Sequence, residues 1–156
     1  MAKKPLSERK TVIGWSEHVD FPDWRVFRLS AKVDTGARTS ALHVEDFELL
    51  PQGRVRFKVV VDSGNPGACA PVTAAISRWG RVRSSNGAYS MRCFVKTRVR
   101  IGPVEKEIEI SLVSRERMAY RMLLGRQALG RDFLVYVGKR RVATRDAGPR
   151  TKRPEP

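Results

Sequence analysis

The feature that most constrains the fold is a series of short segments in which polar and apolar residues alternate, separated by turn-forming residues. Residues 54–61 are the clearest case, because basic and apolar side chains alternate there before the segment becomes continuously apolar. Alternation with a period of two is typical of a β-strand that buries one face. Turn-forming residues precede this segment at 51–53 and follow it at 62–67.

Similar segments recur along most of the chain. They lie at 11–15, 24–33, 91–101, 105–113, 122–124 and 133–137, with weaker strand signals at 72–76 and 79–83. We expect tight turns at 84–87 and 102–103. Residues 38–43 are too rich in Thr and Ser to predict a helix, whereas residues 126–129 predict one helical turn. About seven or eight short strands at this spacing predict a mostly β protein with closed or sandwiched sheets.

A chain of 156 residues, 41% of them hydrophobic, is long enough for one folded domain. We expect this domain at 11–137, after a basic extension at 1–10 and before a disordered basic tail at 138–156. No segment approaches the roughly 18 apolar residues of a membrane helix, and the N-terminus lacks the apolar core of a secretory signal. We therefore expect a cytoplasmic protein without membrane contact.

The formal net charge of +15 indicates a basic surface that attracts polyanions. Residues 1–10 and 138–156 contribute +3 and +5, so +7 remains in the central part of the chain. Charge alone does not choose among nucleic acid, acidic peptides and anionic membranes. Residues 25–28 and 78–83 place arginines beside aromatic residues, which suits stacking on bases but also fits an ordinary half-exposed strand.

Asp34 is the strongest candidate for chemistry. It follows a predicted strand that ends at Val33, and Thr35 and Gly36 come next. The strand would carry the carboxylate to a turn, where Thr35 could form a local hydrogen bond and Gly36 could allow close backbone approach or a positive φ. Asp-Thr-Gly is also common in ordinary turns, so the triplet needs support from the rest of the chain.

Other chemistries have few residues to rest on. His18 and His43 are the only histidines, so a Ser or Cys nucleophile lacks a clear base, and a metal site at His43 with neighbouring carboxylates has no supporting motif. Cys69 and Cys93 lack CxxC spacing, which favours reduced cysteines but leaves a bridge between them open. The sequence contains no glycine-rich phosphate-binding motif. We predict no metal and no cofactor.

Two apposed carboxylates can hydrolyse an amide, because one activates water while the other protonates the leaving nitrogen. Asp34 supplies half of such a site. Asp62, followed by Ser63 and Gly64, looks like the other half, but 28 residues separate it from Asp34, which is too few for a second structural lobe. We therefore interpret residues 62–67 as a hairpin or flap tip, while the turn at 84–87 is the other candidate for the flap. A two-fold homodimer is the alternative, since it would bring Asp34 to its own copy.

The motif around Asp34 resembles the active-site segment of retropepsins, as does an apolar-apolar-Gly-Arg segment at 123–126, about ninety positions further on. The chain is still more similar to a bacterial family of retropepsin-like aspartic peptidases that carries the label ATP-dependent zinc protease. That family includes the peptidase partner of the ribosomal-protein glutamate ligase. The segments that carry this similarity are 13–15, 32–43, 82–87 and 121–129.

The resemblance implies a small closed β-barrel of retropepsin type with one short C-terminal helix. It also implies a homodimeric site in which each chain contributes Asp34 as the catalytic carboxylate, with Thr35 and Gly36 supporting it. Residues that would brace the site are Ala37, Gly125 and Arg126. The zinc and ATP of the family's label have no recognisable residues to bind them in this sequence.

Arg38, Arg83 and Asn86 lie inside the matching segments and are candidate substrate-binding residues. The two arginines could pair with substrate carboxylates, although structural salt bridges would explain them equally well. The association with a glutamate ligase implies an acidic substrate, namely a glutamate tail on a ribosomal protein. Two other classes remain open: a non-enzymatic basic β module that contacts the ribosome or RNA, and a metallopeptidase.

Overall fold

The computed structural model describes residues 10–61, 68–84, 86–114 and 119–144, and every structural statement below concerns these residues. Their strands are β1 (Thr11–Gly14), β2 (Ser16–Phe21), β3 (Val26–Val33), β4 (Ser40–Leu50), β5 (Arg54–Val60), β6 (Cys69–Arg83), β7 (Tyr89–Ile101), β8 (Val104–Val113), β9 (Met122–Leu124) and β10 (Phe133–Tyr136). A 3-10 turn, η1 (Pro22–Trp24), and a short helix, α2 (Arg126–Leu129), complete the described elements. No helix among them is long and apolar enough to cross a membrane.

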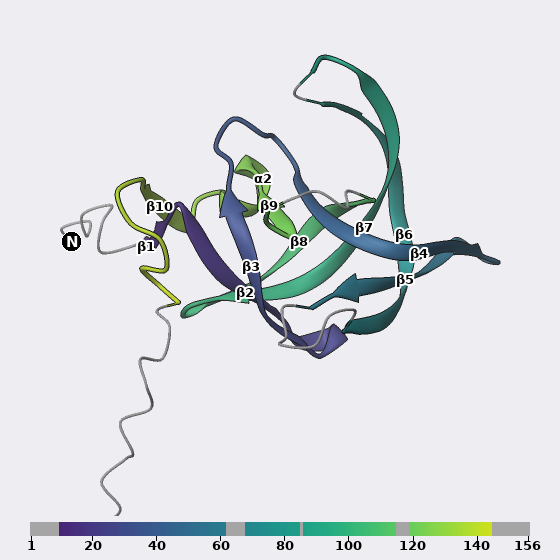
Figure 1. The fold of residues 1–156 in the computed structure, drawn as a ribbon, viewed down its shortest axis with the longest axis horizontal. Helices are drawn as coiled ribbons and strands as arrows, with labels where there is room; N and C mark the ends of the chain where they lie inside the picture. The colour runs from purple at the N-terminus through teal and green to yellow at the C-terminus, as the bar shows by residue number, and fades with distance from the viewer. Residues whose placement is uncertain (1–9, 62–67, 85, 115–118, 145–156) are drawn as a thin grey trace, which may run out of the picture.

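Eight of the strands form one strongly curved sheet (Figure 1). Its order is β2-β3-β9-β4-β5-β6-β7-β8, and further pairings of β2 with β7 and of β4 with β8 close the sheet into a barrel. β1 and β10 form a separate parallel pair. The described residues thus confirm the expected mostly β, closed barrel with one short α-helix. The strands are more numerous than expected and not all short, because β6 and β7 have 15 and 13 residues.

The alternating patterns bury their apolar face inside this barrel. In β5 the side chains of Val55, Phe57 and Val59 are buried, whereas the basic residues between them are exposed. The barrel is filled from several other strands by side chains such as those of Phe21 and Leu42. Each large apolar side chain buried in this way contributes about 1.5–3 kcal/mol of transfer free energy.

In two segments, pairing with neighbouring strands rather than local sequence propensity determines the structure. The Thr- and Ser-rich segment at 38–43 enters β4 at Ser40, because β8 and β9 both pair with this part of the strand. The two weak signals at 72–76 and 79–83 belong to a single strand, β6, whose register shifts between Ile76 and Arg78. Hydrogen bonds to neighbouring strands supply the stability that these sequences do not indicate locally.

The prediction of a disordered tail from residue 138 is wrong for residues 138–144, which we call the C-terminal strap. Backbone amides of residues 142–144 donate hydrogen bonds of 3.0–3.1 Å to the Glu17 carboxylate, and the Thr144 hydroxyl donates one of 2.7 Å. The side chain of Glu17 is fully buried. The strap is held by an acceptor more than a hundred residues away in sequence. Residues 145–156 lie outside the described part of the chain.

Glu17 is charged in this buried position. Burial raises the pKa of its carboxyl, but hydrogen bonds from the Thr144 hydroxyl and from the amides of Gly14, Ala143 and Thr144 outweigh that effect. The net result is a pKa below the usual glutamate value. The ionised carboxylate therefore fastens the strap to the corner between β1 and β2.

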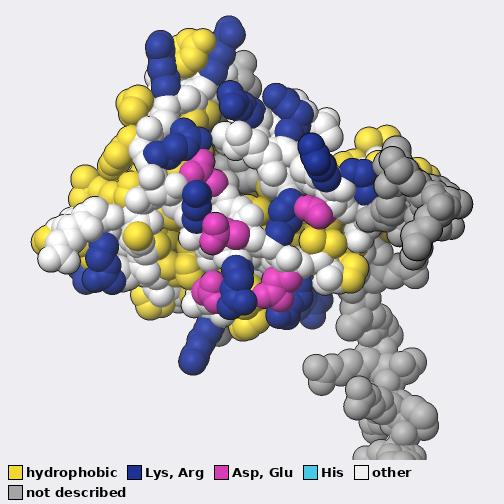
Figure 2. Space-filling view, turned by 180° about the vertical axis from the view of Figure 1, so that it is seen from behind, with side chains coloured by type: hydrophobic (Ala, Val, Ile, Leu, Met, Phe, Trp, Pro, Cys, Tyr) yellow, Lys and Arg dark blue, Asp and Glu magenta, His cyan; other side chains and the backbone are white. Residues whose placement is uncertain are grey.

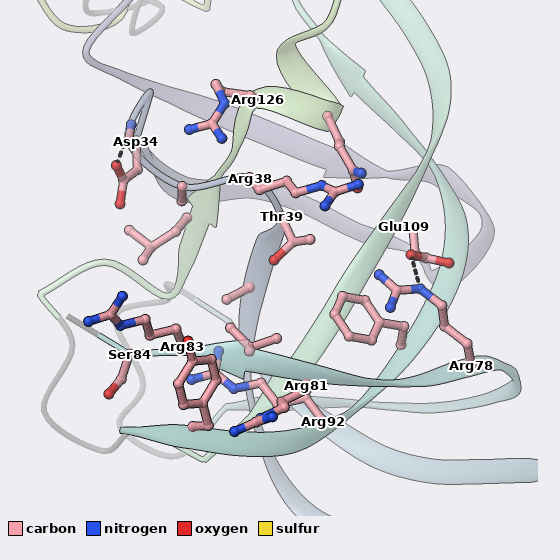
Figure 3. Close-up of a pocket in the computed structure, with 18 residues that line it drawn as sticks. Asp34, Arg38, Thr39, Arg78, Arg81, Arg83, Ser84, Arg92, Glu109 and Arg126 are labelled. Carbon is pink, nitrogen blue, oxygen red and sulfur yellow. Dashed lines mark hydrogen bonds and ion pairs between the residues drawn. The ribbon is translucent and has the colours of Figure 1, made fainter. Parts of the chain in front are cut away.

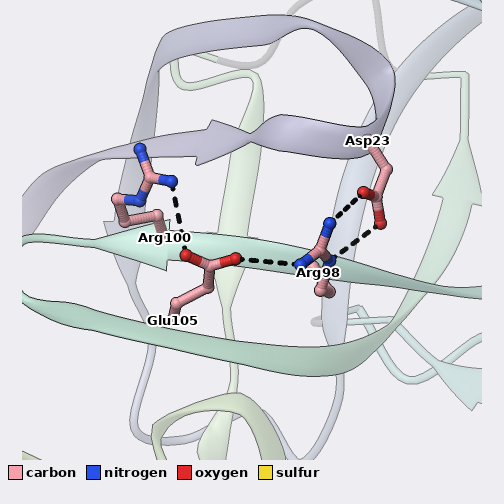
Figure 4. A network of polar contacts seen from close by, with 4 residues as sticks. All are labelled: Asp23, Arg98, Arg100 and Glu105. Atoms are coloured by element: carbon pink, nitrogen blue, oxygen red, sulfur yellow. Dashed lines mark hydrogen bonds and ion pairs between the residues drawn. The ribbon is translucent and has the colours of Figure 1, made fainter.

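A second polar network lies on the surface where η1 meets the β7–β8 hairpin (Figure 4). Arg98 binds both carboxylate oxygens of Asp23, at 2.6 and 3.2 Å, and also reaches Glu105 at 3.3 Å. Arg100 contacts the other oxygen of Glu105 at 3.3 Å. These side chains are largely exposed, so water and salt screen each ion pair and it contributes little to stability.

Candidate active site

Asp34 lies where two parallel strands end. β3 and β9 pair in parallel with Val33 opposite Leu124, so the residues that follow them meet at the same edge of the sheet. The amide of Asp34 donates to the Leu124 carbonyl at 2.9 Å. The topology therefore brings the Asp-Thr-Gly turn directly beside Gly125, although about ninety residues separate the two in sequence.

The Asp34 carboxylate is oriented by the turn that follows it. The amide of Gly36 donates to Oδ1 at 3.0 Å, and the amide of Ala37 donates to the Asp34 carbonyl at 3.2 Å. A Cβ on Gly36 would lie 3.3 Å from that same Oδ1. Gly36 does not have a positive φ, so close approach is what favours glycine here. No hydrogen bond from the described residues reaches Oδ2, and the side chain is partly exposed.

The loop at 34–39 is braced from behind by the start of α2. Amides of Arg126 and Gln127 donate to the carbonyls of Ala37 and Arg38, at 2.8 and 3.0 Å. The Arg126 guanidinium donates to the Thr35 carbonyl at 3.1 Å. These bonds fix the backbone that carries the carboxylate.

Gly125 makes this bracing geometrically feasible. A Cβ at this position would collide with the Thr39 carbonyl and would lie 3.0 Å from the Ala37 carbonyl oxygen. The Gly125 amide donates to the buried hydroxyl of Ser40 at 3.0 Å. Backbone approaches backbone at this point, which only glycine permits without displacement.

Asp34 faces a cavity of about 800 Å³ between its own loop and the β6–β7 hairpin (Figure 3). Two carboxylates line it, Asp34 and Glu109. Six arginines line it as well: Arg38, Arg78, Arg81, Arg83, Arg92 and Arg126. Figure 2 shows Lys and Arg side chains on both sides of the hairpin tip, at the top of that view. The cavity is therefore suited to an anionic ligand.

Some of these arginines are stacked on aromatic rings of β7. The Arg81 guanidinium carbon lies 4.0 Å from the centroid of the Tyr89 ring, and that of Arg83 lies 5.8 Å away. Arg78 lies 3.9 Å from the Phe94 centroid. Cation–π contacts of this kind orient the guanidinium while leaving N–H groups at its edge for a ligand.

Glu109 is engaged by two neighbours on β6. Burial raises the pKa of its carboxyl, but hydrogen bonds from Ser77 at 2.7 Å and Arg78 at 2.8 Å outweigh this and hold the pKa below its usual range. Charges of Arg78 and Lys96 act in the same direction. Glu109 is thus an ionised, paired carboxylate rather than a proton donor.

The structure brings together most of the residues that the sequence indicated. Asp34, Gly36, Ala37, Arg38, Arg83 and Arg126 line the cavity, while Thr35 and Gly125 support the loop behind it. Asn86 does not line the cavity: its Oδ1 accepts hydrogen bonds from the Ser84 hydroxyl and the Ala88 amide inside the hairpin turn. The suggested flap tip at 62–67 lies outside the described residues, whereas the hairpin that ends at 84–87 faces Asp34 across the cavity.

Arg78, Arg81, Arg92, Tyr89 and Glu109 line the cavity as well, although the sequence does not single them out as site residues. The arginine–aromatic pattern at 78–83 is the available signal, but by itself it indicates either a nucleic-acid site or a half-exposed strand. Nothing in the sequence near Glu109 indicates its pairing with β6, because 31 residues separate it from Arg78.

The residues considered for a metal do not form a cluster. His43 is buried, with Nε2 3.7 Å from a Glu45 carboxylate oxygen. Within the described segments, no group of three or more His, Cys, Asp or Glu side chains is placed to hold a metal ion. Cys69 and Cys93 are both free thiols.

Comparison with known proteins gives one family and a small set of relatives. The family model RimB-like, described as retropepsin-like aspartic endopeptidase RimB, matches residues 12–146. A protein named probable alpha-L-glutamate ligase from Shewanella halifaxensis is 31% identical over 133 residues, which is 83% of this chain and 29% of the ligase. A protein of the same name from Parasynechococcus marenigrum is 30% identical over 132 residues, 81% of this chain and 28% of the ligase. The chain thus spans under a third of the length of these curated relatives.

Among solved structures, the chain is similar to Lpg0085 of Legionella pneumophila, a protein described as having unknown function. The TM-score is 0.69 at 23% identity, and the match covers 85% of this chain and 98% of that one. At this identity the likeness supports the fold alone.

Proposed function

The chain belongs to the RimB-like family of retropepsin-like aspartic endopeptidases, and from this premise we propose that it hydrolyses amide bonds with Asp34 as the catalytic carboxylate. The observation that carries the proposal is the setting of Asp34 at the wall of an arginine-lined cavity. One oxygen of the carboxylate is held by the Gly36 amide, while no described residue binds the other. That second oxygen is available to a water molecule.

The reaction needs two carboxyl groups that share one proton. The ionised carboxylate removes a proton from water as the water oxygen attacks the amide carbon. The protonated carboxyl donates its proton to the leaving nitrogen, so the C–N bond breaks and one acid and one amine are released. Thr35 and Gly36 would hold the turn in place, with Ala37, Gly125 and Arg126 bracing it from behind.

A homodimer is the source that we propose for the second carboxyl group. Glu109 is the other carboxylate of the described cavity, and its hydrogen bonds to Ser77 and Arg78 leave it ionised and engaged. A two-fold axis beside Asp34 would place the same residue of a second copy next to it. Each chain would then contribute half of one site.

We propose an acidic peptide as the substrate, with a glutamate tail on a ribosomal protein as the specific candidate. The excess of arginines over carboxylates in the cavity supports this substrate class, as does the similarity to proteins named glutamate ligases. Arg38 and Arg83 are the residues that we expect to pair with substrate carboxylates. For Asn86 we propose a role in shaping the hairpin turn, because its side-chain oxygen is used within that turn.

The direct experiment compares Asp34→Asn with wild-type protein on a glutamate-rich peptide. We expect hydrolysis to fall by about 10²–10⁴-fold, because the amide cannot act as a base, while the melting temperature stays unchanged. Asp46→Asn is a matched control, since Asp46 pairs with Lys58 on an exposed surface outside the cavity. Wild-type rates in Asp34→Asn would show that the mechanism is wrong.

A second candidate function, a non-enzymatic module for RNA or the ribosome, rests on the aromatic residues of the β6–β7 hairpin. Trp79 is 47% exposed and Tyr89 is 55% exposed, with Arg81 stacked on the Tyr89 ring. Such an arrangement suits base stacking and phosphate pairing. Salt-sensitive RNA binding that survives Asp34→Asn, with no cleavage of acidic peptides, would favour this function.

A further inference from the structure

The Arg78 side chain is held in one position by contacts with its neighbours. Its Nε donates to Glu109 at 2.8 Å, and its guanidinium carbon lies 3.9 Å from the centroid of the Phe94 ring. The other carboxylate oxygen of Glu109 accepts from the Ser77 hydroxyl at 2.7 Å. Arg78 is thus fixed at its edge and on one face. In Figure 3, Arg78 and Glu109 lie at the opposite end of the cavity from Asp34.

Gly80 leaves the space that this arrangement requires. A Cβ on Gly80 would collide with Nη1 of Arg78 and would lie 2.6 Å from Cε2 of Phe94. Glycine in the interior of a strand is unfavourable, because it loses more backbone entropy and packs no side chain. Its presence within the 15-residue strand β6 is explained by the room it gives to the guanidinium.

The part of Arg78 that remains available faces the cavity. Glu109 is bound through Nε, and no hydrogen bond from Nη1 or Nη2 to another described residue accompanies it. The Arg78 side chain is 44% exposed, and it lines the same cavity as Asp34. Two parallel N–H groups in the plane of a guanidinium match the two oxygens of a carboxylate.

We infer that Arg78 is a carboxylate-binding anchor that positions an acidic ligand in the cavity, with Glu109, Phe94 and Gly80 holding it ready. The inference rests on the proposed function in one respect, namely that the ligand is a peptide that extends to Asp34. The bound carboxylate comes either from a glutamate side chain or from the C-terminus of the peptide, since both present the same planar anion. Preorganisation is what distinguishes Arg78 from a flexible surface arginine.

The test measures binding separately from hydrolysis. Fluorescein-labelled pentaglutamate is titrated with Asp34→Asn protein, which leaves the peptide intact, and fluorescence anisotropy gives the dissociation constant. Adding Arg78→Met to the Asp34→Asn protein should weaken peptide binding by about tenfold or more. The substitution removes the charged guanidinium and keeps the length of the side chain. Arg78→Lys should recover only part of the affinity, because a lysine supplies charge without paired donors.

Arg98→Met is the matched control. Arg98 is also a half-exposed arginine on the same sheet and is paired with Asp23 and Glu105, but it does not line the cavity (Figure 4). We expect its dissociation constant to stay within about twofold of that of the Asp34→Asn protein, because the charge at position 98 does not contact the ligand. Melting temperatures of both variants check that each protein is folded.

Two peptide arms identify the source of the carboxylate. If the carboxylate is the peptide's C-terminus, amidating that end weakens binding to the Asp34→Asn protein. It then leaves binding to the protein that also carries Arg78→Met unchanged. If the carboxylate is a glutamate side chain, replacing that glutamate by glutamine weakens binding in the same selective way. Replacing each of the five glutamates in turn identifies the position. Equal affinity of the parent and Arg78→Met overturns the inference, as does the absence of binding to either protein.

The outcomes for the anchor and for the peptidase are separable. Binding that depends on Arg78, without cleavage by the wild-type chain, would keep the anchor and reject the proposed function. Cleavage of acidic peptides with a KM that is unchanged in Arg78→Met would keep the function and reject the anchor.

Discussion

Two carboxylates, Glu17 and Asp34, show how differently this fold uses the same chemical group. Glu17 is fully buried and accepts five hydrogen bonds, four of them from backbone amides. Asp34 is partly exposed and accepts one, from the Gly36 amide. A carboxylate whose acceptor capacity is filled by the protein stabilises the fold, whereas one with an oxygen left over can engage water or a substrate.

The hydrogen bonds around the two residues show the same contrast between a structural carboxylate and an available one. Donors around Glu17 come from the C-terminal strap and from Gly14, so the carboxylate joins distant segments of chain. Support for Asp34 goes to its backbone instead, through the bonds that link residues 34–39 to the start of α2. The protein fixes the position of Asp34 without using up its side chain. Changes at the two sites should therefore affect different measurements.

Glu17→Gln should give the largest loss of stability. The amide replaces a charged acceptor and turns an NH₂ group toward backbone N–H donors, so buried groups lose their partners. We expect the free energy of unfolding in urea to fall by about 3 kcal/mol. Hydrolysis per folded molecule should be retained. Glu48→Gln is the control, because Glu48 pairs with Arg56 on an exposed surface, and its loss should be about 1 kcal/mol or less. Equal losses in the two variants would remove the distinction between Glu17 and a surface carboxylate.

Gly125→Ala should disturb the Asp34 loop itself. The added Cβ meets the carbonyls of Thr39 and Ala37, so the loop must move, at an expected cost of about 1–3 kcal/mol. We expect kcat to fall along with stability, since the backbone that carries Asp34 shifts. Gly53→Ala serves as the comparison: its φ of +66° strains an alanine, but nothing lies within 4 Å of the new Cβ. Gly53→Ala should lose some stability and keep kcat, and a normal kcat in Gly125→Ala would contradict the bracing role.

The pH dependence of stability gives a smaller effect with a definite sign. The pKa of Glu17 is lowered in the folded protein, so its contribution is fully present above the unfolded-state pKa and is lost as pH falls through the folded-state value. The pKa of Glu109 is lowered as well and acts in the same direction. Urea midpoints should therefore decrease below about pH 4, near the ordinary range of glutamate. Glu17→Gln should flatten this decrease, and an unchanged pH profile in that variant would contradict the assignment.

The same comparison shows what the sequence could and could not predict. The Asp34 turn was predictable because its parts are neighbours in sequence, and a distant segment of recognisable pattern, at Gly125 and Arg126, supported it. Glu17 gave no signal, because it resembles any polar residue of a half-exposed strand and its partners in the strap are at least 125 residues away. The pairing of Arg78 with Glu109 was hidden for the same reason. Contacts between distant strands depend on sheet order and register, which local alternation does not determine.

The central claim is that two chains each contribute Asp34 to one site. The most direct measurement mixes wild-type protein with Asp34→Asn at equal concentrations, under conditions that allow subunits to exchange, and follows hydrolysis of a glutamate-rich peptide. If the site is shared and pairing is random, activity should fall to about half of that of the wild-type protein alone, because about half of the wild-type chains then sit in mixed dimers. Excess Asp34→Asn should reduce it further. Activity that stays constant as Asp34→Asn is added would contradict the claim and would mean that each chain works alone.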